Sequence, residues 1–369
     1  MMVSKGRKVR YAVVGCGWIS QAAFMPGVAH TGNSEMTALV TGDSDKAEAL
    51  GRQYGIQRTY HYDAWRAAIE SGGFDAVYLA LPNWMHREFA VPALEAGLHV
   101  LLEKPMATSE DDCRAIQGAA LKSGAKLMIA YRLHFEPATL EVLRQVRGQH
   151  LGHARLFTAT FTQHVSERNH RAQHGFWAGP VADMGPYPIN AARMIFGTEP
   201  IEVMAWGMNH TDLGFEFHDT VSVMLRFPGD RMALFTVAYG LNPINEYRIV
   251  GTDADLLVNP GFTFPGPLKH QLRVGDSKTR SDFPAIDQFG GETQYFSDCI
   301  LNDTDPEPDG EEGLLDVRVV AAIGRALETG RAQTLPPHTR QKTVLVTQGT
   351  DLPAITPPPM VRAYEPSKG

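Results

Sequence analysis

The sequence predicts an α/β domain with a doubly wound parallel sheet, followed by an α+β domain with a large, mostly antiparallel open sheet. Over residues 8–130, apolar strand-like stretches alternate with helix-like stretches, which is typical of a parallel sheet covered by helices. After about residue 150, strand-like stretches follow one another across Gly, Pro and Asp turns, which favours antiparallel pairing. The length of 369 residues exceeds one ordinary core and agrees with two domains.

The elements of the first region follow from apolar runs and capping residues. Asp43 or Ser44 is expected to cap the second helix, and Gly55 to end it. The fourth helix is expected to be interrupted at Pro92, which lacks a backbone N–H. In chain order we expect strands at 9–14, 35–40, 74–81, 99–104 and 126–131, and helices at 18–26, 43–55, 64–71, 84–97 and 109–124.

The second region is dominated by strands, and its end is rich in proline. We expect the proline-rich end to form a surface tail or arm. The expected domains are residues 1–130, which bind the cofactor, residues 131–350, which bind the substrate and form the oligomer, and a tail at 351–369. The expected strands lie within 153–165, 201–211, 219–229, 231–240 and 245–260, and the expected helices at 187–197 and 313–330.

Composition excludes several classes of function. The net charge of −7 and pI of about 6.1 argue against bulk nucleic-acid binding. The three cysteines are odd in number and far apart, which disfavours a disulfide framework or a zinc site. No stretch approaches the roughly 18 apolar residues of a membrane span, and the first residues do not read as a signal peptide. We therefore expect a cytoplasmic protein without a membrane partner.

A glycine-rich turn follows the first strand. Gly15 and Gly17 end that strand, and Ser20 stands where a third glycine or alanine is often found. Such a turn lets backbone N–H groups at a helix N-terminus approach a pyrophosphate. A bare G-x-G is weak on its own and also fits a purely structural turn, but its place after the first strand of an α/β unit favours a dinucleotide site.

The end of the second strand indicates which dinucleotide binds. Enzymes that use NAD place an acid there, which bonds the ribose 2′-hydroxyl. In this sequence the position is the neutral Thr41, Asp43 is placed to cap a helix, and Lys46 lies one turn into that helix. A hydroxyl with a nearby ammonium suits a 2′-phosphate, so NADP is expected, with NAD as the less favoured cofactor. The alternative for Lys46 is an ordinary solvated lysine.

Three segments together resemble one family, the Gfo/Idh/MocA oxidoreductases. They are "LPNWMHREFA" (81–90), "HVLLEKPMATS" (99–109) and "GPVADMGPYPINAARMIFG" (179–197). The similarity is greatest to the glucose–fructose oxidoreductase-like and NADP-dependent aldose dehydrogenase members. It implies a Rossmann domain, a large open sheet, and hydride transfer between nicotinamide and a pyranose or cyclic polyol. It also implies a homodimer or homotetramer that associates through the exposed sheet face.

The resemblance also implies the catalytic residues. Lys104 matches the family's catalytic-site lysine, and its ammonium can stabilise negative charge on a neighbouring oxygen. Tyr187 is assigned as general acid/base and Asp183 as the residue that orients sugar hydroxyls. A phenol has an ordinary pKa of about 10, so Tyr187 needs a cation such as Lys104 to act at neutral pH.

Further contacts are expected around these residues. His86 lies near the expected nicotinamide end, but it also fits a plain helix-face residue. Cofactor contacts are expected from Gly15, Gly17, Trp18, Ile19, Thr41, Lys46, Pro82, Asn83, His86, Glu103 and Lys104, and substrate contacts from Arg132, His134, Asp183 and Tyr187.

Some features depart from the family. "WAGPVADMG" replaces a run of glycines, and the stretch 163–177, rich in histidine and arginine, is expected to be a polar substrate rim that holds no metal. The N-terminal arm that wraps the cofactor in an exported relative is absent, so an exchangeable NADP is expected. The alternatives to a sugar dehydrogenase or reductase are an NAD-dependent glycosidase on the same fold and a non-catalytic dinucleotide-binding regulator.

Overall fold

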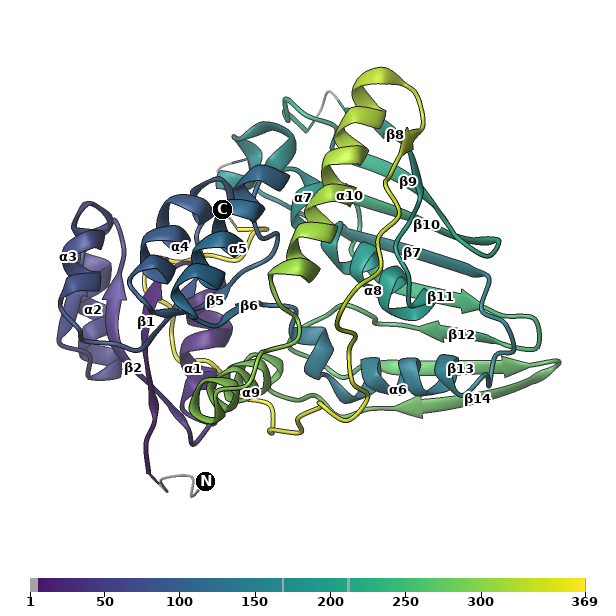
Figure 1. The fold of residues 1–369 in the computed structure, drawn as a ribbon. Helices are drawn as coiled ribbons and strands as arrows, with labels where there is room; N and C mark the ends of the chain where they lie inside the picture. The colour runs from purple at the N-terminus through teal and green to yellow at the C-terminus, as the bar shows by residue number, and fades with distance from the viewer. Residues whose placement is uncertain (1–5, 168, 211–212, 369) are drawn as a thin grey trace. The chain divides into compact units, whose positions relative to one another are not determined.

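The computed structural model describes residues 6–167, 169–210 and 213–368, with the backbone alone at His170 (Figure 1). Arg168 and Thr211, which fall within stretches interpreted above, lie outside the described residues. The chain folds as two compact units. The first holds residues 6–132, 287–314 and 350–365, and the second holds the described part of 133–286 together with 315–349 and 366–368. The domain boundaries expected from the sequence, at residues 130 and 350, divide the chain into continuous segments, whereas the first unit also includes later parts of the chain. Those boundaries stay a prediction.

The first unit contains a six-stranded sheet in which every pairing is parallel, with the order β3-β2-β1-β4-β5-β6. Its central strands are buried on both faces, which is why they are apolar throughout. The strand β3 was not expected, because it is short and mostly exposed at the sheet edge. The strands are β1 (Val9–Val14), β2 (Ser34–Val40), β3 (Arg58–Tyr60), β4 (Ala76–Leu79), β5 (His99–Leu102) and β6 (Leu127–Ile129). The predicted parallel sheet is confirmed.

Helices surround this sheet, and two proline positions differ from expectation. Pro26 does not end the first helix, because it stands in the first turn of α1, where a missing N–H is tolerated. Pro92 lies inside α4 without ending it. The elements are a π-helical turn at Ser20–Phe24, α1 (Met25–Val28), α2 (Ser44–Tyr54), α3 (Trp65–Glu70), α4 (His86–Glu95), α5 (Glu110–Ser123) and α9 (Gln288–Asn302).

The helix α9 joins the first unit from the far end of the sequence. It packs beside α1 and against β1, β2 and β5, and Figure 1 shows the green α9 next to the purple α1. Glycines permit the close approach, since a Cβ added at Gly27 would lie 2.9 Å from the backbone nitrogen of Gly290. Asp287 caps the helix by accepting from the N–H of Gly290 at 2.8 Å.

The second unit contains a nine-stranded sheet, with the order β14-β13-β12-β11-β7-β10-β9-β8-β15. Among the described strands of this second sheet, only β7 and β10 pair in parallel, and the other pairings are antiparallel. The strands are β7 (Leu156–Gln163), β8 (Glu202–Met208), β9 (Thr220–Phe227), β10 (Arg231–Tyr239), β11 (Ile244–Val250), β12 (Asp255–Val258), β13 (Lys269–Val274), β14 (Ser277–Asp282) and β15 (Gln333–Thr334). The predicted, mostly antiparallel sheet is confirmed.

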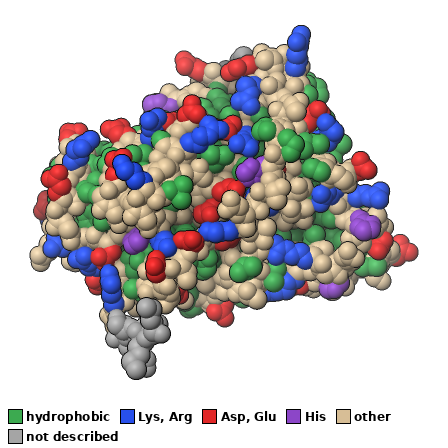
Figure 2. Space-filling model, viewed as in Figure 1, with side chains coloured by type: hydrophobic (Ala, Val, Ile, Leu, Met, Phe, Trp, Pro, Cys, Tyr) green, Lys and Arg blue, Asp and Glu red, His purple; other side chains and the backbone are tan. Residues whose placement is uncertain are grey.

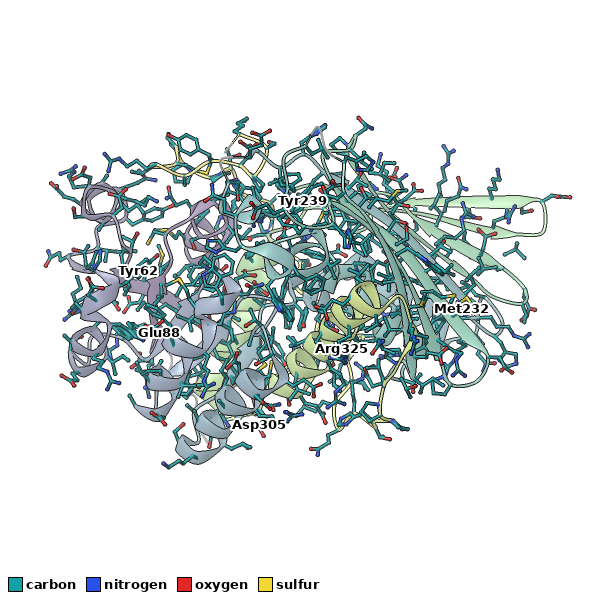
Figure 3. The ribbon with its side chains drawn as sticks, turned by 90° about the horizontal axis from the view of Figure 1, so that it is seen from above. Tyr62, Glu88, Met232, Tyr239, Asp305 and Arg325 are labelled. Carbon is teal, nitrogen blue, oxygen red and sulfur yellow. The ribbon has the colours of Figure 1, made fainter. Side chains whose placement is uncertain are left out.

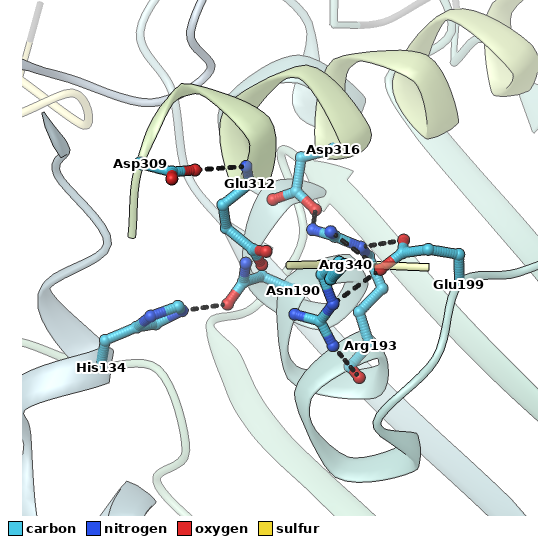
Figure 4. A network of polar contacts seen from close by, with 8 residues as sticks. All are labelled: His134, Asn190, Arg193, Glu199, Asp309, Glu312, Asp316 and Arg340. Carbon is cyan, nitrogen blue, oxygen red and sulfur yellow. Dashed lines mark hydrogen bonds and ion pairs between the residues drawn. The ribbon is translucent and has the colours of Figure 1, made fainter. Parts of the chain in front are cut away.

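The helices of the second unit are α6 (Pro137–Arg147), α7 (Pro180–Asp183), α8 (Pro186–Phe196) and most of α10 (Gly310–Thr329). Residues 310–314, at the start of α10, belong to the first unit. A buried ionic network joins two of these helices (Figure 4). Arg193 of α8 donates to Glu199 at 2.6 Å and pairs with Asp316 of α10, and Arg340 pairs with Glu199 at 2.9 Å. Each charged group therefore has an opposite charge beside it, as burial requires.

The surface carries mixed charges. Figure 2 shows Lys and Arg side chains interspersed with Asp and Glu on the face that it draws, without a broad basic field. Among the described residues, no helix combines the length and the apolar character needed to cross a membrane.

Candidate active site

The glycine turn after β1 is held by specific hydrogen bonds. Gly15 has a φ of +91°, and a Cβ there would lie 2.5 Å from the carbonyl oxygen of Ala80, so only glycine fits. Its N–H donates to the carbonyl of Val40 at 2.9 Å, and its own carbonyl accepts from the Ser20 hydroxyl at 2.5 Å. Ser20 stands where the glycine pattern often has a third glycine or alanine, and its hydrogen bond to Gly15 stabilises the turn between β1 and the helix.

Gly17 faces open space. A Cβ added there would meet no atom within 4 Å, and the residue is exposed. Trp18 and Ile19, both half-buried, begin the helical segment that follows. An open glycine backbone at the end of a first strand, directly before a helix, is the cradle that a pyrophosphate needs. The turn therefore fits a dinucleotide.

The end of β2 lies at the same edge of the sheet. Thr41 is buried, and its N–H donates to Tyr60 at 3.0 Å. Asp43 caps α2 by accepting from the N–H of Lys46 at 3.0 Å, and this bond lowers the pKa of Asp43. The ring of Tyr62, labelled in Figure 3, lies 3.1 Å from where a Cβ on Gly42 would stand. The predicted cap is confirmed, and Asp43 stays ionised.

The loop after β4 is tied to the loop after β5 by His86. Pro82 precedes a short 3-10 turn, Asn83–Met85, and both Pro82 and Asn83 are half-buried. The ring of His86 is buried, with Nε2 at 2.8 Å from the carbonyl of Leu81 and Nδ1 at 3.0 Å from that of Pro105. Burial lowers the pKa of His86, although its bonds to carbonyl groups oppose the shift. These contacts support a positioning role, and cofactor contact by His86 stays a prediction.

Glu103 and Lys104 follow β5 at this edge. Val14, Leu79 and Leu102 are successive register partners, so the residues after them emerge together. The hydroxyl of Tyr78 donates to Glu103 at 2.6 Å. Burial raises the pKa of Glu103, opposed by this bond and by the cations Lys104 and Arg132. Lys104 is half-buried and begins a cis peptide bond to Pro105.

The two residues proposed for substrate contact after β6 are enclosed. Arg132 pairs with Gln288 and lies 5.9 Å from the ring centre of Phe289. His134 is fully buried in the second unit, and its Nε2 is hydrogen-bonded to Asn190 at 2.7 Å. The structure supports packing roles for both, and their contact with a substrate stays a prediction.

Asp183, the last residue of α7, is surrounded by donors. Its Oδ2 accepts from Gln163 Nε2, from Arg171 Nε and from the Tyr239 hydroxyl, each at 3.0 Å. Burial raises the pKa of Tyr239 well above its ordinary value, and the Asp183 charge adds to this shift. Figure 3 labels Tyr239, which ends β10. Asp183 therefore fixes the polar stretch after β7 to the sheet.

Tyr187 stands one turn further, in the first turn of α8. Its ring is half-buried and packs edge-on against Phe161 at 5.5 Å and beside Phe262 at 6.0 Å. Arg171 lies close enough to interact electrostatically with Tyr187. Burial lowers the pKa of Arg171, but Asp183, Tyr239 and Tyr187 outweigh it and the pKa is raised. The second unit thus holds Tyr187 within electrostatic reach of Arg171.

Sequence reasoning missed Arg171, Gln163 and Tyr239 as partners of Asp183. The one signal for the first two was the polar stretch 163–177, and nothing distinguished Tyr239 from a core aromatic. The proposed residues divide between the units: Gly15, Thr41 and Lys104 lie in the first, and Asp183 and Tyr187 in the second. Within the described chain, no three His, Cys, Asp or Glu side chains group as metal ligands.

Comparisons with known proteins show which family this chain resembles. Residues 9–131 match an oxidoreductase family with an NAD-binding Rossmann fold, and residues 139–257 match the GFO/IDH/MocA C-terminal domain. The structure of aldose-aldose oxidoreductase from Caulobacter crescentus, in complex with glycerol, is similar with a TM-score of 0.84. It is 33% identical and covers 89% of this chain and 100% of its own.

Two further relatives support the same assignment. D-xylose 1-dehydrogenase (NADP+) from Haloarcula marismortui is 29% identical over 87% of this chain and 91% of its own length. A 3-ketoreductase from Actinomadura kijaniata, solved with NADP and TDP-benzene, has a TM-score of 0.80 and 25% identity, and covers 87% of this chain and 98% of its own. The chain therefore belongs to the Gfo/Idh/MocA family of oxidoreductases.

Proposed function

We propose that this protein transfers a hydride between NADP and a sugar, either an aldose or a related pyranose or polyol. The observation that carries the proposal is the Asp183–Arg171 pair beside Tyr187, in a chain whose first unit has a glycine turn open to a dinucleotide. The sugar is supported by relatives named for aldoses and D-xylose, each aligned over most of this chain.

NADP is proposed over NAD on two grounds. Relatives are named for NADP or were solved with it. In this chain, the end of β2 carries the neutral Thr41 with Lys46 nearby, and Asp43, the acid nearest the strand end, already caps a helix. When bound, the nicotinamide accepts or returns the hydride.

The protein's own residues handle the proton. Tyr187 takes the proton of the reacting hydroxyl during oxidation and returns it during reduction. Because a phenol has an ordinary pKa of about 10, its anion needs a nearby cation at neutral pH. Lys104 is the proposed cation, and Arg171 is a second cation in the same unit as Tyr187. Asp183 holds Arg171 in place, and we propose that it also orients the sugar hydroxyls.

Steady-state kinetics on a panel of aldoses and cyclic polyols test the proposal, with NADPH absorbance as the signal. Tyr187→Phe should lower kcat by about 100-fold or more, since a positioned acid/base contributes about 10²–10⁴. Lys104→Ala should lower it by about 100-fold as well. The matched controls are Tyr364→Phe, at an exposed tyrosine, and Lys122→Ala, on the outer face of α5.

Retained turnover in both variants would defeat the mechanism. Sugar release from a glycoside without net NADPH would instead identify an NAD-dependent glycosidase. Cofactor binding without turnover on any substrate of the panel would indicate a regulator.

A further inference from the structure

The C-terminal segment 359–362 lies on the first unit beside the glycine turn. The buried Gln21 holds it through two hydrogen bonds: its Nε2 donates to the Val361 carbonyl at 3.0 Å, and its Oε1 accepts from the Val361 N–H at 2.7 Å. The same Nε2 donates to the carbonyl of Cys16 at 2.8 Å. One amide therefore joins the centre of the glycine turn directly to the segment.

The next residue, Arg362, reaches the start of α2. Its Nη1 lies 2.9 Å from Asp43 Oδ1, 3.2 Å from Asp43 Oδ2 and 3.0 Å from Asp45 Oδ2. Its φ of 45° is in the left-handed region, which an arginine rarely adopts, so the surrounding contacts must hold the backbone in this conformation. The side chain of Arg362 is 55% exposed.

Most of the guanidinium is still available. All its hydrogen bonds and ion pairs with described residues use Nη1, so Nε and Nη2 can donate to another group. The fork of donors matches two oxygens of a phosphate, which an ammonium does not.

The negative charge of Asp43 at the end of β2 has to be neutralised before a phosphate can bind there. The N–H of Lys46 lowers the pKa of Asp43, and Arg362 adds to the shift, so Asp43 is an anion at neutral pH. An anion at the end of β2 favours a ribose hydroxyl and repels a 2′-phosphate. Arg362 neutralises it and leaves free donors beside it.

We propose that Arg362 is a cofactor-specificity residue, which the C-terminal segment brings to the end of β2 to bind the 2′-phosphate of NADP. This inference rests on the proposed function, because it requires NADP as the cofactor. Gln21 is the positioning residue: it fixes the segment to the turn that holds the pyrophosphate, so both phosphate-binding parts move together.

Calorimetric titration of the purified full chain tests the proposal without turnover. NADP, NAD and 2′,5′-ADP are the probes. Arg362→Ala should weaken binding of NADP and of 2′,5′-ADP by about 10- to 100-fold, the effect of losing hydrogen bonds between charged groups. NAD binding should change by less than about threefold. Arg66→Ala, at an exposed arginine of α3, is the matched control and should change neither.

A second variant should act in the opposite direction. Asp45 competes for Arg362 but does not cap α2. Asp45→Asn should therefore tighten NADP binding by about two- to fivefold, the scale of an exposed ion pair, and leave NAD binding unchanged. Raising the salt concentration should weaken NADP binding in the wild type more than in Arg362→Ala.

The outcomes separate the two proposals. If the wild type prefers NADP and Arg362→Ala binds it equally well, the role of Arg362 is wrong and the proposed function stands. If Arg362→Ala weakens the binding of NADP and of NAD by the same factor, Arg362 only holds the C-terminal segment in place, which also overturns the proposal. A wild type that binds NAD more tightly than NADP would refute the proposed cofactor, and the role of Arg362 with it.

Discussion

Gly15 and Gly17 stand in one turn but are required for different reasons. Gly15 has a positive φ and no room for a Cβ beside Ala80, whereas Gly17 has open space around it. Gly15→Ala should therefore lower the free energy of unfolding by about 2 kcal/mol or more. Gly17→Ala should leave it within about 0.5 kcal/mol, but weaken dinucleotide binding at least tenfold because the added methyl fills the cradle.

Thermal unfolding and calorimetric titration of both variants separate the two effects. The result that contradicts the assignment is a Gly17→Ala protein that binds dinucleotide like the wild type, because the pyrophosphate would then lie elsewhere.

Glu292 is a buried carboxyl group that makes stability depend on pH. It is fully enclosed, and neither of its oxygens has a hydrogen-bond partner among the described residues. Burial raises the pKa of Glu292 well above its ordinary value; the charges of Glu103 and Asp287 add to the shift, and Arg132 opposes it. Because the folded state binds the proton more tightly, the contribution of Glu292 to stability is fully present below the unfolded pKa of about 4.3 and is lost as the pH rises through the folded pKa.

Glu292→Gln should remove this dependence. The variant should gain about 1 kcal/mol or more over the wild type at pH 8, because folded wild type must either bury an unpartnered charge or keep a proton that the unfolded chain releases, and the gain should shrink toward pH 5. Denaturant unfolding at several pH values measures it, with Glu328→Gln, at an exposed position of α10, as control. Parallel curves for wild type and Glu292→Gln would rule out Glu292 as the cause.

At the scale of elements, the network between α8 and α10 gives the next prediction. Arg193 and Asp316 are both fully buried. Arg193→Leu leaves the charge of Asp316 unpaired, and breaking such a pair costs about 3–5 kcal/mol of unfolding free energy. The double variant Arg193→Leu/Asp316→Leu should regain much of that loss, because Arg340 still pairs with Glu199. Urea unfolding tests this, and equal losses in the single and double variants would argue against an ionic origin.

The elements that the sequence predicted best are those with local signals. The helix α2 has its cap at Asp43 and its end at Gly55, as expected, and α5 fills the range expected for it, with Ser109 as its cap and Gly124 at its end. These signals depend on neighbouring residues alone, so no tertiary information is needed.

The missed elements lack such signals. In α9 the adjacent glycines Gly290 and Gly291 lower helix propensity, yet close packing requires them, since a Cβ on Gly291 would lie 2.0 Å from Thr350 Oγ1. The edge strand β14 has no apolar alternation because every residue in it is exposed. Both are determined by distant partners, which a local pattern does not reveal.

At the scale of the whole molecule, long-range contacts decided what could be predicted about the site. The predicted residues Gly15, Thr41 and Lys104 follow parallel strands, so their shared edge could be inferred from topology alone. The position of Arg362 beside Asp43 could not, because a proline-rich C-terminal stretch gives no sign of where it docks. Its place depends on Gln21, a residue that reads as part of an ordinary helix.

The outer face of the nine-stranded sheet bears on the assembly of the whole molecule. Alternate residues of β8–β10 point away from the core, and Met204, Met224 and Leu234 form one row across the three strands. Trp206, also on this face, is 65% exposed, and Met232, labelled in Figure 3, lies near the start of β10. Exposed apolar side chains grouped on one sheet face are typical of a protein interface.

We therefore expect a homodimer or homotetramer that buries this face, and a specific interface requires about 1,000 Å² or more. Leu234→Glu places a charge at one end of the row and should shift the molar mass measured by size-exclusion chromatography with light scattering toward the monomer. Leu121→Glu, at an exposed leucine of α5, is the matched control and should keep the wild-type mass. A thermal melt checks that the Leu234→Glu protein is folded. A charge buried in the interface without a partner would cost several kcal/mol. A folded Leu234→Glu protein that keeps the mass of an oligomeric wild type would therefore show that the sheet face is not the interface. A monomeric wild type would refute the expected oligomer itself.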